Sequence, residues 1–586
     1  MSVPSTATPP GQERSTVPSG RAPAVRTPKA RPGRGRRRWL GAAAVLAVVT
    51  AALGVWLAAG QVNTGGAALA GRFLSGALDP RLDLPFLETV ARAALTTVAY
   101  AVLGTALALL IGLTLGPLLA QAGHQAGRRR APRSARAGWL LGRAALTVPR
   151  GVHEVVWALL LLAILGLDPL VAILAIGVPY GAVTAKVVAD LLDEAPRAPM
   201  EALLAAGASR PKALLSSLVP AVSGDVVAYG FYRFECSLRA AAILGIVGVG
   251  GLGFELALSF QALRYDEMWT LIGALVVLSA AAEAWSDGVR RRLGVRRPSS
   301  CLRATAGGPT ARAASPRPGR DPVLMGSAVV AAALAVVSAW WVGVDPSTLW
   351  AERARALAAD VLGGFWPPDV AAAGGAELLG DAAATLAMSI LGAGLAFVLA
   401  LVLVVPAAAT THLRASATPR RGSAWTAAVQ RAAFRAPLLL LRAVPPPVWA
   451  FVLLLVVFPG ILPGALALAA YNLGVLGRLL AEAVEELDQG PLRALEALGA
   501  SRAQVVLHGV LPAALTRFAA HGLERWETAI RDTVVVGLVG AGGLGVLLDG
   551  QLARFAFDAV AVTLLVLLAL TFFVDVAGAR LREALR

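Results

Sequence analysis

Apolar runs longer than about 18 residues recur along the whole of this 586-residue sequence, and a helix of that length spans the hydrocarbon core of a bilayer. The chain is 57% hydrophobic and only 15% charged, whereas an ordinary soluble domain carries about 25% charged residues. A soluble enzyme and a disordered scaffold are therefore excluded. The sequence predicts an all-α polytopic membrane protein.

The net charge of +17 is concentrated in basic clusters between the apolar runs. Cytoplasmic loops of membrane proteins carry such an excess of lysine and arginine, so this charge indicates orientation and no nucleic-acid partner. With both termini in the cytoplasm, every basic cluster falls on the cytoplasmic side. About twelve spans then follow, near residues 40–60, 90–120, 153–167, 170–191, 218–238, 268–286, 323–343, 381–409, 444–459, 464–484, 512–532 and 556–577.

The same distribution predicts four segments. Residues 1–38 form a Pro/Ser-rich, disordered basic tail in the cytoplasm, and residues 288–321 form a basic cytoplasmic linker. A first unit covers 39–287 and a second covers 322–586. The apolar run that starts after Arg38 also resembles a secretory signal, but about 20 apolar residues exceed a signal core of 7–15, which favours a retained span.

The two units are copies of one another. Gly207-Ala208-Ser209-Arg210 recurs 292 residues later as Gly499-Ala500-Ser501-Arg502, and about 23 of the 58 residue pairs from 201/493 to 258/550 are identical without a gap. Both copies have the same predicted topology. The sequence therefore predicts a parallel repeat about an axis along the membrane normal, with a transport pathway between the halves.

A short cytoplasmic loop precedes one span of each copy. In the first copy, Glu201 and Ala202 begin a run of small residues that ends at Gly207, where glycine allows a sharp turn. Pro220 follows thirteen residues later and opens the next span, where a missing amide hydrogen is tolerated. An ordinary turn between helices would explain this pattern in a single copy.

The second copy keeps the same spacing but changes the charges. Gly499 again ends the loop, while Arg493 stands at the position of Glu201 and Glu496 stands one turn further along. The repeated spacing favours a functional loop over a simple turn, and the exchanged charges predict that the two loops make different contacts.

Ionisable side chains inside spans are costly and indicate function. Here they are Arg233, Glu235 and Arg239, with Arg525, Glu527 and Arg531 at the matching positions. Each glutamate precedes an arginine by four residues, the favourable order for an ion pair within a helix. Arg233 and Arg525 have no such partner, so they either bind an oxyanion in the pathway or extend to the membrane surface.

Each copy also contains a glycine-rich segment, within residues 240–258 and 533–548. The glycines are Gly248, Gly250, Gly251 and Gly253, and Gly540, Gly542, Gly543 and Gly545. No lysine follows at the spacing of a phosphate-binding loop, so the chain has no ATPase site of that type. We interpret these segments as glycine-broken, partly re-entrant helices near the external side.

These motifs resemble those of a known family. The loop around Glu201 and Gly207 resembles the Glu-Ala-Ala loop of ATP-binding-cassette (ABC) importer permeases, which docks on the ATPase subunit. Residues 150–158, 232–239 and 244–256 are similar to phosphonate importer permeases. The resemblance covers about 90–285 and 380–577, and implies two fused type I (MetI-like) permease domains.

The resemblance also implies function and partners. The chain would be a multi-pass inner-membrane permease for a phosphonate-like anion. It would work with two copies of a cytoplasmic ATPase and an external binding protein, either periplasmic or lipid-anchored. No cofactor or metal is expected, because the five histidines are scattered. Phosphate, phosphite or another small solute is an alternative cargo, and a twelve-span secondary transporter is the main alternative class.

Overall fold

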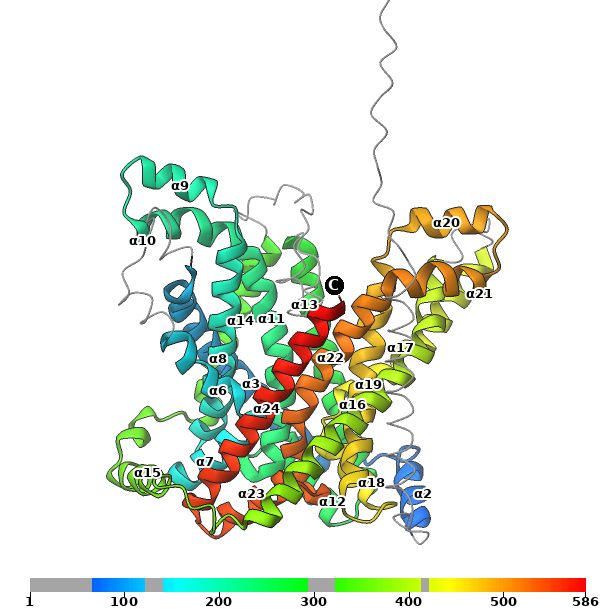
Figure 1. Ribbon diagram of the computed structural model, residues 1–586. Helices are drawn as coiled ribbons and strands as arrows, with labels where there is room; N and C mark the ends of the chain where they lie inside the picture. Colours follow the sequence, from blue (N-terminus) through cyan, green and yellow to red (C-terminus); the bar gives the residue numbers. More distant parts are fainter. Residues whose placement is uncertain (1–65, 122–140, 294–321, 413–420, 586) are drawn as a thin grey trace, which may run out of the picture. The chain divides into compact units, whose positions relative to one another are not determined.

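The computed structural model describes residues 66–121, 141–293, 322–412 and 421–585, and every regular element in these ranges is helical (Figure 1). Eight helices are long and apolar enough to cross a membrane, or eleven spans if each of three bent helix pairs counts as one. These eleven correspond to the eleven spans predicted in the described ranges, which confirms the all-α polytopic fold class. The predicted span at 40–60, the tail 1–38 and linker residues 294–321 lie outside the described residues.

The first half consists of α2 (Gly66–Gly76), α3 (Leu84–Leu119), α6 (Thr147–Gly151), α7 (Glu154–Leu165), α8 (Pro169–Glu194), α9 (Ala198–Ala205), α10 (Arg210–Ala213), α11 (Val219–Leu244), α12 (Leu252–Gln261) and α13 (Tyr265–Leu293). The second half consists of α14 (Pro322–Val342), α15 (Glu352–Gly364), α16 (Gly375–His412), α17 (Arg421–Ala443), α18 (Pro446–Leu454), α19 (Ile461–Glu485), α20 (Gln489–Ala497), α21 (Arg502–Val505), α22 (Leu511–Val536), α23 (Leu544–Ala553) and α24 (Phe557–Leu585). Helices α8 and α19, α11 and α22, and α13 and α24 each begin 292 residues apart, so the sequence repeat is a structural repeat.

The predicted spans at 153–167 and 444–459 are each part of a bent pair of helices and not one straight helix. Helix α7 has 12 residues and α18 only 9, which is too short to cross a bilayer alone. Each follows another helix across a sharp bend, of 85° before α7 and 91° before α18. The bend before α7 lies at His153, whose Nδ1 accepts from the amide of Val155, and α18 starts with prolines that cannot continue the preceding helix.

Two helices of the second half pack on the first half. Helix α14, the first of the second half, packs along α3 of the first half, where the indole of Trp341 donates to the Thr96 hydroxyl at 3.2 Å. The indole of Trp285 in α13 likewise donates to Ser327 of α14 at 3.2 Å. Helix α15 packs against α7 of the first half. The boundary between the halves in the sequence is therefore not a boundary in the packing.

The glycine-rich segments break the helices that carry them. Gly248, Gly250 and Gly251 have φ of +110°, +105° and +86°, and the matching Gly540, Gly542 and Gly543 have +96°, +83° and +74°. Side chains disfavour this region strongly, which explains why glycine occupies all six positions. After each break a threonine hydroxyl of α3 or α16 accepts the first amide hydrogen of α12 or α23, both at 2.9 Å.

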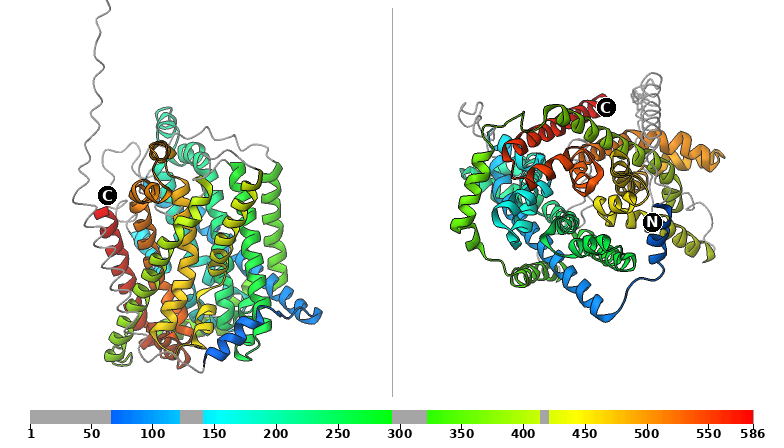
Figure 2. Two further views of the ribbon diagram at one scale, coloured as in Figure 1. Left: turned by 90° about the vertical axis from the view of Figure 1, so that its right-hand side faces the viewer. Right: turned by 90° about the horizontal axis from the view of Figure 1, so that it is seen from below.

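The short helices α9 and α20 lie at one end of the helix bundle, where α24 also finishes (Figure 1). The left-hand view of Figure 2, turned by 90° about the vertical axis, also shows α9 and α20 at this end of the bundle. Helices α12 and α23, which follow the glycine breaks, lie at the opposite end (Figure 1). The predicted loops and the predicted glycine-rich segments therefore occupy opposite ends of the molecule.

Candidate functional site

Each loop at the first end is a short helix closed by a glycine. The amide of Gly207 donates to the carbonyl of Leu204 at 3.1 Å, and the amide of Ala208 donates to Leu203 at 3.0 Å. This pair of bonds is the Schellman motif, which requires a left-handed residue after the helix. Gly207 has φ +87°, and an added Cβ would meet no atom within 4 Å. The requirement at Gly207 is therefore conformational, not steric.

The loop of the second half has the same geometry. Gly499 has φ +82°, its amide donates to Glu496 at 2.9 Å, and the amide of Ala500 donates to Leu495 at 3.1 Å. Each short helix packs through buried side chains such as Met200 or Leu492 on an apolar cluster of its own half. The opposite side of each helix is exposed.

The exposed sides of the two short helices differ in charge. Glu201 and Ala202 are exposed on α9, whereas Arg493 is exposed on α20. Glu496 is only partly exposed. Leu498, at the end of α20, is 84% exposed, and the matching residue of α9 is the smaller Ala206. A partner that touches both helices meets the carboxylate of Glu201 at one and the guanidinium of Arg493 beside the exposed Leu498 at the other.

The structure corrects the ion pairs expected inside α11 and α22. Glu235 does not pair with Arg239 but accepts from Arg442 of α17 at 3.2 Å, and Glu527 accepts from Arg582 of α24 at 2.5 Å rather than from Arg531. Spacing along one helix predicted the wrong partner because both glutamates face a neighbouring helix.

Arg442 is the centre of an ion-pair network that joins the halves. It binds Glu235 of α11 and Glu283 of α13, both in the first half. Glu283 also binds Arg478 of α19 at 2.7 Å, and Arg478 binds Glu482 at 2.9 Å. We call these five residues the inter-half network. Its side chains are between 10% and 22% exposed, so the charges are partly removed from water.

Arg233 lies in a cluster of tyrosines, which we call the first arginine site. Its Nε donates to the hydroxyl of Tyr229 at 2.6 Å. Its guanidinium carbon lies 5.0 Å from the ring centres of Tyr180 and Tyr229 and 5.5 Å from that of Tyr232, within the range of cation–π contacts. Within the described ranges no carboxylate lies within 4.0 Å of Arg233, so its guanidinium is stabilised by cation–π contacts and the Tyr229 hydroxyl instead.

The matching positions of the second half hold different residues. Arg525 takes the place of Arg233, while Asn472, His521 and Glu524 take the places of Tyr180, Tyr229 and Tyr232. We call these four residues the second arginine site, to which Asn472 is assigned because it matches Tyr180, which lies 5.0 Å from Arg233. Arg525 donates from Nη2 to Thr528 at 2.9 Å, and His521 Nδ1 lies 3.8 Å from Glu524 Oε2. The sequence analysis missed the three neighbours. The 292-residue offset gives His521 and Glu524 from Tyr229 and Tyr232, which lie beside Arg233 on the same helix, whereas Tyr180 is brought to Arg233 only by helix packing.

The two arginine sites lie near the boundary between the halves. Tyr471 of α19 and Tyr232 of α11 both interact electrostatically with Arg239 and Arg525, although they belong to opposite halves. Arg239 contacts the thiol of Cys236 at 3.5 Å, and among the described residues neither Arg239 nor Arg531 has a carboxylate within 4.0 Å. Guanidinium groups that have no carboxylate within 4.0 Å are thus gathered near the boundary between the halves.

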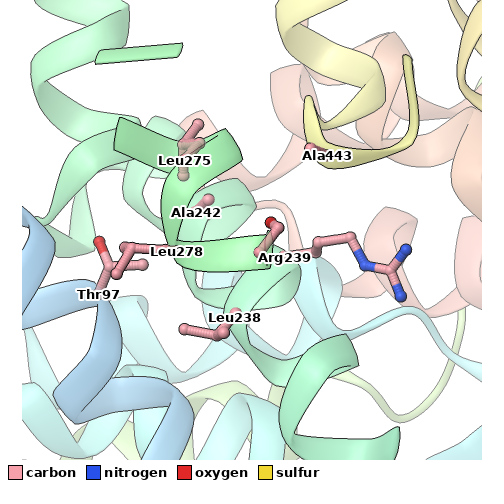
Figure 3. Close-up of a pocket in the computed structure, with 8 residues that line it drawn as sticks. Thr97, Leu238, Arg239, Ala242, Leu275, Leu278 and Ala443 are labelled. Carbon is pink, nitrogen blue, oxygen red and sulfur yellow. The ribbon is translucent and has the colours of Figure 1, made fainter. Parts of the chain in front are cut away.

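A small pocket borders Arg239, and its lining is mainly apolar. The guanidinium group points away from Thr97 and Leu238 in Figure 3. The lining residues are Thr97, Leu238, Arg239, Ala242, Leu275, Leu278, Ser279 and Ala443. This pocket lies between α3, α11, α13 and the end of α17.

Two regions of the chain, residues 136–295 and 424–586, match the family of binding-protein-dependent transport system inner membrane components. Together the regions cover more than half of the sequence. The chain therefore belongs to this family, whose members are permeases of ABC importers. The double match confirms the prediction of two permease units in one chain, and it identifies a multi-pass inner-membrane protein that works with ATPase and substrate-binding subunits.

Three relatives place the chain within that family. The phosphate-import permease protein of Mycolicibacterium smegmatis is 28% identical over 87% of both chains. A phosphite transport system permease protein of Stutzerimonas stutzeri is 34% identical over 44% of this chain and 88% of its own length. A protein of Escherichia coli described as a cryptic phosphonate transport system permease is 36% identical over 20% of this chain and 97% of its own length.

Proposed function

We propose that this chain forms the complete membrane pathway of an importer for a phosphorus oxyanion, with a phosphonate as its preferred cargo. The relatives are described as permeases for phosphate, phosphite and phosphonate, which share a tetrahedral anionic group. The observation that carries the proposal is the group of four arginines on α11 and α22 that have no carboxylate within 4.0 Å in the described ranges. Guanidinium groups bind such anions through paired hydrogen bonds.

The chain supplies both transmembrane units, which we assign to residues 39–287 and 322–586, with 1–38 as a cytoplasmic tail and 288–321 as a cytoplasmic linker. Helices α9 and α20 are then the two docking points for ATPase subunits. This assignment places their end of the bundle, and both termini, in the cytoplasm. The glycine-broken segments face the external binding protein. ATP hydrolysis belongs to the separate ATPase, since this sequence contains no phosphate-binding loop of the ATPase type.

The test of the cargo is growth on a single phosphorus source. A strain that lacks other phosphorus importers should grow on methylphosphonate with this gene and its ATPase and binding protein, and should stop growing when this gene is deleted. Parallel cultures on phosphate and phosphite identify the alternative cargoes. Normal growth of the deletion strain on all three sources would contradict the proposed function.

Stoichiometry gives a prediction that separates this chain from single-unit permeases. If one chain supplies both transmembrane units, the purified importer should contain one copy of it, two ATPase subunits and one binding protein. The mass of the intact complex, measured in detergent by native mass spectrometry, checks this ratio. Two copies of the chain for each pair of ATPase subunits would contradict the fusion of a complete pathway.

A further inference from the structure

The second arginine site contains most of the buried polar atoms that lack a hydrogen bond. Nine buried side-chain nitrogen and oxygen atoms in the described residues have no hydrogen-bond partner, and five of them belong to Asn472, His521, Glu524 and Arg525. Asn472 has none for either amide atom although it is 0% exposed, and His521 is 6% exposed. Buried polar groups are normally satisfied, so such a concentration indicates a site built for something other than folding.

The first arginine site has the opposite character. Arg233 donates to Tyr229, its charge is surrounded by three rings, and the hydroxyl of Tyr180 donates to Glu154 at 3.2 Å. None of the nine atoms belongs to this site. Two positions related by the repeat have therefore diverged, one into a self-satisfied aromatic cluster and the other into an unsatisfied polar one. A symmetrical anion pathway would not require this difference.

The atoms of the second arginine site define the chemistry of a ligand. Arg525 and the amide nitrogen of Asn472 are donors, whereas Glu524 and the amide oxygen of Asn472 are acceptors. His521, Glu524 and Arg525 share one face of α22, because they are three and four residues apart. A ligand that satisfies this set must accept hydrogen bonds and also donate at least one.

We propose that the second arginine site is the cargo-recognition site of the permease, and that it selects a phosphorus oxyanion which keeps one P–OH group. The anionic oxygens of such a ligand bind Arg525, and the P–OH donates to Glu524. A fully ionised oxyanion has no P–OH and offers only hydrogen-bond acceptors. The carboxylate of Glu524 repels such a ligand, because two acceptor oxygens would face each other with no proton between them. This inference rests on the proposed function, and it adds which half binds the cargo and in which protonation state.

The test uses the complete importer, reconstituted in lipid vesicles with its ATPase and a saturating amount of binding protein. Uptake of methylphosphonate and ATP hydrolysis are measured together with the thermal midpoint of the purified complex. Asn472→Leu should reduce uptake at least about tenfold, since a hydrogen bond to an ionised group contributes roughly 1.5–3 kcal/mol. It should not lower the thermal midpoint, because an unsatisfied buried amide is replaced by an apolar group of similar size. If Asn472 had only a structural role, Asn472→Leu would lower both uptake and the thermal midpoint.

Glu524→Gln tests the selection of the protonated ligand. Uptake of methylphosphonate is compared with uptake of its monomethyl ester, which has no P–OH when ionised. The wild type should prefer methylphosphonate, and the variant should reduce this preference at least about fivefold, the loss of one charged hydrogen bond setting the scale. The same binding protein delivers both compounds to both variants, so the change in the ratio belongs to the permease.

The matched control lies in the first half. Thr184→Val, on α8 and outside both arginine sites, removes a buried hydroxyl that donates at 2.7 Å to the carbonyl of Tyr180 within the same helix, so it should keep uptake within about twofold of the wild type. Wild-type uptake in Asn472→Leu, or an unchanged preference in Glu524→Gln, would overturn the inference. A wild-type importer that takes up no phosphorus oxyanion at all would instead contradict the proposed function.

Discussion

Gly207→Val and Gly499→Val should each abolish transport while the protein still inserts into the membrane. Both glycines close a Schellman motif at φ of +87° and +82°. A residue with a Cβ is destabilised by about 1–2 kcal/mol in this left-handed region, and a β-branched side chain is destabilised more. The α9 or α20 helix then unwinds or turns away from the ATPase that we place against it. Vesicle uptake, with the membrane level of the protein measured by immunoblot, checks the result.

Two controls separate coupling from local strain. Gly343→Val introduces the same strain at φ +64°, where an added Cβ also meets no atom within 4 Å, but at the end of α14 instead of in a loop. It should leave transport intact. Gly207→Asn should retain most of the activity, since asparagine tolerates the left-handed region. Normal uptake in Gly207→Val and in Gly499→Val would show that the loops are simple turns.

The unequal charges of the two loops extend this expectation. Glu201→Ala should reduce transport more than Arg493→Ala, because the sequence keeps an acid at the family position only in α9. The double glycine variant should be no worse than the more damaging single one, if one uncoupled ATPase already stops a cycle that needs two. An additive loss would indicate that the two loops act independently.

Arg442→Met should be among the most destabilising substitutions in the chain. It removes the cation between Glu235 and Glu283 and leaves two partly buried carboxylates without it. Breaking a buried ion pair from one side costs roughly 3–5 kcal/mol. Glu283 keeps its ion pair with Arg478, so the loss falls mainly on Glu235. The loss falls on the contact between the halves, so the thermal midpoint in detergent should drop and the linked halves should become more sensitive to proteolysis.

Arg150→Met is the matched control, because Arg150 occupies the corresponding position of the first half. It has no carboxylate within 4.0 Å among the described residues, and its replacement should change the midpoint little. Adding Glu235→Gln and Glu283→Gln to Arg442→Met should recover part of the loss, since neutral side chains need no counter-charge. Equal destabilisation by Arg150→Met and Arg442→Met would contradict a special role for the inter-half network.

The spans were predictable because the length of an apolar run depends only on local composition. The bends before α7 and α18 were not predicted for the same reason, because the apolar composition of a run is the same whether its helix is straight or bent. The partner of Glu235 was not predictable from helical spacing, because Arg442 lies 207 residues away and in the other half. Such a contact is fixed only by how helices pack.

The functional residues divide in the same way. Gly207 and Gly499 were identified from spacing because the Schellman motif is local, with its bonds inside a six-residue window. Arg233 and Arg525 were identified as arginines inside spans. Their different surroundings required the knowledge that α8 packs against α11, which brings Tyr180 to Arg233. With that one contact known, the repeat alone gives Asn472 as its counterpart.

The packing of α14 on α3 has a consequence for how the molecule is made. Helix α3 belongs to the first half, yet its covering helix is translated more than 200 residues later. The part of α3 that packs against α14 therefore stays uncovered by it until the ribosome has completed α14. A covalent connection makes that encounter intramolecular, at an effective concentration that two separate chains do not reach. If the gene were split between residues 294 and 321, assembly would become a second-order reaction that depends on expression level.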